Sequence, residues 1–87
     1  MALVILHNRI WHRGVRVQIR QGNNANAELN PLVWDGRIPD GGSQSIQSDG
    51  EDIYFRRERD PDHTFTGWQI WTHRPVYDDP KYDEDIV

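Results

Sequence analysis

Glycine and proline interrupt this chain so often that a helix of ordinary length has almost nowhere to form. The 87 residues include seven glycines and five prolines, and the longest stretch free of both, residues 1–13, is 13 residues long. Residues that favour strands (Val, Ile, Thr, Phe, Tyr, Trp) number 26, whereas those that favour helices (Ala, Leu, Met, Glu, Lys) number 13. The sequence therefore predicts an all-β protein of short strands joined by turns.

Alternation of apolar and polar residues indicates where the strands lie and which face of each is buried. The clearest strands are 15–20 and 52–57, and four more are expected at 3–7 (with both faces covered), 32–34, 43–48 (a weak edge strand) and 68–73. Turn signals between them favour a small antiparallel β-sandwich or β-barrel of six to seven short strands. The inward members of the alternating strands should share one core: Val15, Val17, Ile19, Ile53, Phe55, Trp68 and Ile70.

The charge of the chain is divided between its two ends. Residues 1–20 hold four arginines and no acid, whereas residues 75–87 hold five acids and one lysine, within a net charge of −4 for the whole chain. We expect a single domain over residues 1–75 and an acidic tail over 76–87 that is extended or disordered. The tail should adhere to the basic surface that Arg9, Arg13, Arg16 and Arg20 provide, because opposite charges attract at short range.

Composition excludes several classes of protein. The chain has no cysteine, which rules out disulfide frameworks and thiolate metal centres, and it carries no nucleotide-binding or hydrolase motif. The longest apolar run, Ala2–Leu6, is too short for a membrane span or an ordinary signal peptide, so a cytoplasmic protein without membrane contact is expected. The region before the acidic tail has no net charge, which makes nucleic acid an improbable partner. No cofactor is expected.

Histidines and aspartates are the residues from which a metal site would be built. His7, His12, His63 and His73 show no H-x-H spacing, so scattered surface histidines are the simpler interpretation. Aspartates in neighbouring turns can bind calcium, although an aspartate before a glycine also suits a tight turn for conformational reasons. The candidate calcium ligands are Asp35, Asp40, Asp60 and Asp62.

Aromatic and arginine side chains give the most specific functional hypothesis. Period-2 alternation predicts one face that carries Tyr54, Arg56, Gln69, Trp71 and His73, and this face is either wet or covered by a second sheet or the tail. This composition is typical of protein-binding hot spots and of platforms on which sugars stack. The leading hypothesis is a non-catalytic module that binds a protein partner or itself. A carbohydrate- or calcium-binding, lectin-like domain is the alternative, and a small enzyme of unknown reaction is the third possibility.

Overall fold

The computed structural model describes residues 1–74 and 80–87, and within them the chain forms seven strands and one short 3-10 helix. The elements are β1 (Ala2–His7), β2 (Val15–Gly22), the 3-10 helix η1 (Ala27–Leu29), β3 (Leu32–Ile38), β4 (Ser43–Ser48), β5 (Asp52–Arg57), β6 (Gln69–Trp71) and β7 (Lys81–Asp85). The all-β class and the number of strands are confirmed. In this described part of the chain, no helix has the length and apolar character needed to cross a membrane.

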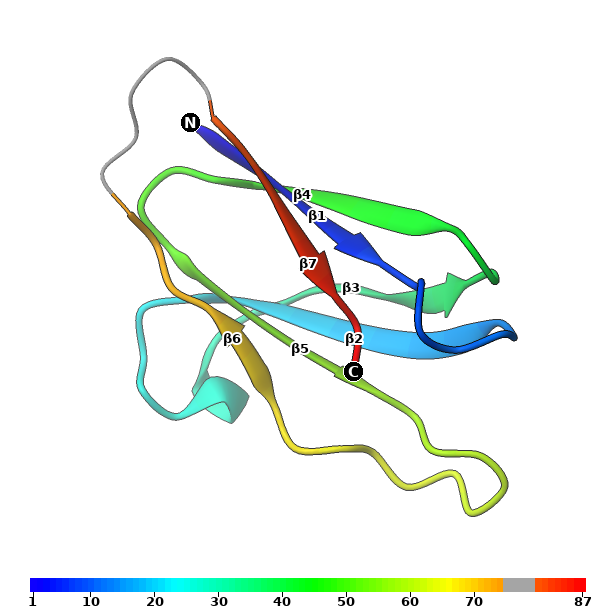
Figure 1. The fold of residues 1–87 in the computed structure, drawn as a ribbon. Helices are drawn as coiled ribbons and strands as arrows, with labels where there is room; N and C mark the ends of the chain where they lie inside the picture. Colours follow the sequence, from blue (N-terminus) through cyan, green and yellow to red (C-terminus); the bar gives the residue numbers. More distant parts are fainter. Residues whose placement is uncertain (75–79) are drawn as a thin grey trace.

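The strands form two sheets that face each other, as Figure 1 shows. One sheet has the order β4-β1-β7, and the other has the order β3-β2-β5-β6. Neighbouring strands are antiparallel except for β1 and β7, which run parallel. Of the two expected architectures, the sandwich is the one observed, with a parallel pair that the alternation of residues did not indicate.

The hydrophobic core fills the space between the sheets and takes residues from both. Five of the expected core residues, Val15, Val17, Ile19, Ile53 and Phe55, are buried there. The other buried apolar members of this cluster are Ala2, Val4, Leu6, Ile38, Trp71 and Ile86. Strand β1 buries only its inward face completely, and its outward face is half buried, so the expectation that both faces are covered is wrong for the outward one.

Strand β6 presents the opposite faces to those expected. Trp71 is 1% exposed in the core, whereas Ile70 is 51% exposed. The pairing of β6 with β5 explains this, because residues paired across two strands share a face. Trp71 pairs with the buried Ile53, and Ile70 pairs with Tyr54 on the outer face. The prediction that Trp68 and Ile70 belong to the core is therefore wrong.

The acidic segment is not a tail without regular structure, because residues 81–85 form β7 and pair with β1. Tyr82 packs against the core and Ile86 is completely buried. The expected attraction to the basic end is present in one ion pair, in which Nε of Arg9 lies 2.6 Å from Oδ1 of Asp85. Residues 76–79 of the expected tail, Tyr77 among them, lie outside the described residues.

Candidate functional site

The residues expected to form one face are divided by the fold between two faces. Tyr54 and Arg56 lie on the outer face of the four-stranded sheet, whereas Trp71 lies in the core. Gln69 also faces inward, where its amide donates to the Asp85 carbonyl at 3.2 Å and accepts from the Val87 N–H at 3.0 Å. His73 is exposed just beyond the end of β6. Of the predicted set, only Tyr54 and Arg56 therefore stay together on the outer face.

Arg56 occupies the centre of this outer face between two aromatic rings. Its guanidinium carbon lies 4.5 Å from the ring centre of Phe65 and 4.4 Å from that of Trp68. Its Nε and Nη2 donate to the Gln18 side-chain oxygen at 3.0 and 2.9 Å. Two rings and a fixed amide hold the guanidinium in one orientation, so this part of the surface is preorganised.

A second arginine on the same face, Arg16 of β2, connects this strand to β3 and to the residue that follows β5. The Nε and Nη2 of Arg16 donate to the two carboxylate oxygens of Asp35 at 3.0 and 2.9 Å, and Nη1 donates to Glu58 at 3.2 Å. The hydrogen bonds from Arg16 hold the pKa of the Asp35 carboxyl below its usual value, and the same contacts raise the pKa of Arg16. The carboxylates are thus partners of arginines on a protein surface, which is a structural role.

An asparagine-rich segment forms a wall at one end of the face. Asn26 caps η1 by accepting from the Glu28 N–H, and Asn30 accepts from the Asn24 N–H at 3.0 Å. The Tyr54 hydroxyl donates to the Asn24 carbonyl at 3.0 Å, which attaches this segment to β5. Hydrogen bonds within the segment and to β5 therefore hold this wall in place.

A groove of about 590 Å³ runs between this wall and the edge of the sheet. Its lining combines aliphatic, aromatic, amide and carboxylate groups: Asn23, Ala25, Asn26, Ala27, Asp52, Tyr54, Trp68 and Ile70. The Trp68 indole N–H donates to Glu28 at 3.1 Å, and Asp52 accepts from the His73 N–H at 2.8 Å. The exposed Ile70 and the half-buried Trp68 are therefore the main apolar groups that this groove offers to a ligand.

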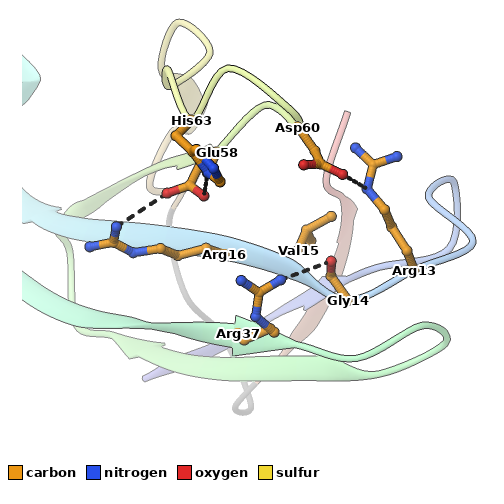
Figure 2. Close-up of a pocket in the computed structure, with 8 residues that line it drawn as sticks. All are labelled: Arg13, Gly14, Val15, Arg16, Arg37, Glu58, Asp60 and His63. Atoms are coloured by element: carbon orange, nitrogen blue, oxygen red, sulfur yellow. Dashed lines mark hydrogen bonds and ion pairs between the residues drawn. The ribbon is translucent and has the colours of Figure 1, made fainter.

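A smaller and more polar pocket of about 160 Å³ lies at the end of the sandwich near the start of β2. Its lining, drawn in Figure 2, includes Arg13, Arg16 and Arg37 together with Glu58, Asp60 and His63. His63 Nδ1 lies 2.9 Å from Glu58 Oε1, and this contact raises the pKa of His63 while it lowers the pKa of Glu58. Arg13, Arg16 and His63 each lie against a carboxylate of the pocket, whereas Arg37 donates to the Gly14 carbonyl.

The contact between His63 and Glu58 predicts a measurable titration. We expect the pKa of His63 to lie above 6.5, because the carboxylate favours the protonated ring. The stabilisation from this contact should be fully present below about pH 6.5, the pKa of His63 in the unfolded chain. It should be lost as the pH rises through the higher pKa of His63 in the folded chain. An NMR titration of the His63 ring measures it, and Glu58→Gln should return the pKa toward the ordinary value. An unchanged pKa in Glu58→Gln would show that the contact does not form in solution.

The four aspartates considered as calcium ligands do not come together. Asp35 pairs with Arg16, Asp60 lies 3.9 Å from Arg13, and Asp62 accepts from Thr64 in its own turn. Asp40 is exposed in the turn before β4. Over residues 1–74 and 80–87, no three His, Cys, Asp or Glu side chains are grouped so that they could hold a metal ion. The aspartates therefore have turn and ion-pair roles in this structure.

Comparisons with known proteins returned no match: no family model, no curated protein and no solved structure is significantly similar to this chain.

Proposed function

We propose that this chain is a non-catalytic binding module that holds a segment of a protein partner in the groove beside Trp68 and Ile70. The observation that supports this proposal best is the exposed Ile70 next to a half-buried tryptophan, in a groove with ordered walls. Tryptophan, tyrosine and arginine are enriched among the residues that dominate binding energy. A partner that places an apolar side chain on Ile70 and Trp68 would remove both from water.

The charge near the groove favours a basic residue in the partner. Asn23 lines the groove and bonds both the Gly50 carbonyl and the Asp52 N–H, which places the turn at 49–51 beside it. Within the described part of the chain, Asp49 and Glu51 form no ion pair with a basic side chain. The partner segment is therefore expected to combine an apolar residue with a nearby lysine or arginine.

A carbohydrate ligand is the second candidate, because the groove combines a tryptophan with amides and a carboxylate. A sugar that stacks needs an open aromatic face. Arg56 already covers one face of Trp68, and Tyr54 is only 6% exposed. The groove thus has little open ring surface, which makes a peptide segment the better-supported ligand.

A peptide library displayed on phage, selected against the full chain, tests the proposal. We expect selected peptides to carry an apolar residue near a lysine or arginine. Ile70→Asp should weaken their binding by about 2 kcal/mol or more, a roughly thirtyfold rise in Kd, because a charge would enter the apolar contact. Trp68→Ala should weaken binding in the same direction. Circular dichroism would verify that both variants keep the fold.

Ile10→Asp is the matched control, because Ile10 is 46% exposed and lies outside the groove. It should bind the selected peptides as the unaltered chain does. Equal binding by Ile70→Asp and Ile10→Asp would contradict the proposed site. Binding on a glycan array that Ile70→Asp abolishes, with no peptide selected, would instead support the carbohydrate candidate.

A further inference from the structure

Strand β3 is one edge of the four-stranded sheet. Among the described strands its only neighbour there is β2, and its seven residues include two charges, Asp35 and Arg37, but no lysine or proline. Leu32 and Val33 at its start are 45% and 44% exposed. An exposed edge strand is a template for pairing with another strand.

The other edge strands are less suited to pairing with another strand. Strand β6 has only three residues, β4 is built mainly from serine and glutamine, and β7 carries Lys81, Asp83 and Asp85. Short or charged edges are the usual means by which proteins prevent such pairing. Among the edges described, β3 is the longest, and its two charges, Asp35 and Arg37, are opposite in sign.

The sequence of β3 is complementary to itself in one antiparallel register. When the register is centred on Gly36, Asp35 of each copy lies opposite Arg37 of the other, on the outer face. A register centred on Asp35 or on Arg37 would instead place like charges opposite each other, which is unfavourable. A register centred on Trp34 would place Asp35 opposite Val33, with no charge complement.

Gly36 and Arg37 lie at the centre of the favoured register. Gly36 carries no side chain, and the Trp34 ring of the same strand fills the space beside it, because a Cβ there would lie 2.7 Å from that ring. The Arg37 guanidinium donates to the Gly14 carbonyl at 3.2 Å, and no carboxylate pairs with it in the part of the chain that the structure describes. The Arg37 guanidinium is therefore available to the Asp35 carboxylate of a second copy.

We propose that two copies of this chain pair through their β3 strands, antiparallel and centred on Gly36, so that their sheets join into one. This inference is independent of the proposed groove, which lies on the opposite edge of the sheet. Paired in this way, both outer faces would point in the same direction, and the dimer would present two grooves to a multivalent partner. The contact is small, so a weak dimer is expected.

Sedimentation velocity of the full chain, over concentrations up to the submillimolar range, tests the dimer. We expect the mass to rise toward that of two chains. Arg37→Asp should raise the dimer Kd by about tenfold, because two attractive cross-strand pairs become repulsive. A chain that stays monomeric throughout, or an Arg37→Asp variant that dimerises as tightly as the unaltered chain, would overturn the proposal.

Disulfide formation tests the register, and it does not depend on the charge of Arg37. The chain has no cysteine, so Asp35→Cys and Arg37→Cys each supply one thiol. In the proposed register the two unlike positions face each other, within the range that a disulfide spans. Two like positions would be about 8 Å apart, which is too far. Oxidising a mixture should yield mainly the mixed dimer. A random mixture of linked pairs would overturn the register, and a thermal melt of each variant would verify its fold.

Discussion

Replacing Trp71 with alanine is expected to lower the free energy of unfolding by about 3 to 5 kcal/mol. The side chain is 1% exposed, lies opposite Ile53 on β5 and meets the Tyr82 ring at a centre distance of 5.3 Å. Its removal leaves a cavity between the two sheets that neighbours cannot fill. Urea unfolding followed by circular dichroism measures the loss, and the change is a large part of the stability of a small domain.

Trp68→Ala is the matched control, because it removes the same side chain from the opposite face of the same segment. Trp68 contacts the guanidinium groups of Arg56 and Arg20 on the outer face, so its loss should cost about 1 to 2 kcal/mol, from two cation–π contacts, a hydrogen bond to Glu28 and some apolar area. Comparing the two variants thus separates the tryptophan that the fold needs from the tryptophan that is expected to bind the ligand. If Trp68→Ala unfolded the chain while Trp71→Ala left it stable, the faces of β6 would be the reverse of those described.

This pair also shows how far the sequence alone predicts the fold. Strand β2 alternates cleanly between valine or isoleucine and arginine or glutamine, so its buried face follows from the pattern. The segment around β6 has a tryptophan on each face. Alternation shows that Trp68 and Ile70 share a face, but it does not show which face is inside. That choice depends on the register with β5 and on Tyr82 from β7, and both are contacts between distant parts of the chain.

The sequence predicted the candidate site only in part. Tyr54 and Arg56 lie on the predicted outer face, because β5 alternates with two clearly apolar residues on the other side. Trp68, Ile70 and the asparagine-rich wall were missed. The capping pattern of Asn26 before η1 was a local signal of an ordered turn. No local pattern shows that this turn lies beside β5, since that contact is made by the Tyr54 hydroxyl, 30 residues further along the chain than Asn24.

Strand β7 was not predicted from the sequence because the segment is strongly acidic. Inward Tyr82 and Ile86 alternate with outward Asp83 and Asp85, but three acids in five residues resemble a solvated segment. Asp83 and Asp85 are tolerated because their outward positions meet basic groups. Asp83 lies 2.7 Å from Nε2 of His7, and Asp85 pairs with Arg9. We therefore expect the buried residues, rather than the charges, to hold β7 against β1.

Deleting residues 81–87 should therefore abolish the cooperative fold, or lower its free energy of unfolding by more than about 5 kcal/mol. The deletion removes Ile86 and Tyr82 from the core and takes away the parallel partner of β1. It also removes the carbonyl of Ile86 that accepts from the Trp11 indole at 3.1 Å. Thermal melting followed by circular dichroism measures the loss, and since buried apolar area dominates it, the loss should be nearly the same at low and high salt.

The double variant Asp83→Asn with Asp85→Asn separates charge from packing. It keeps the strand and the buried residues while it removes the carboxylates that face His7 and Arg9. Because both contacts are exposed at the surface, the cost should stay below about 1 kcal/mol for each pair and should fall as salt screens the charges. A double variant as unstable as the deletion would show that β7 is held by its charges. A deletion variant with the stability of the full chain would show that β7 is dispensable to the sandwich, against the buried positions of Tyr82 and Ile86.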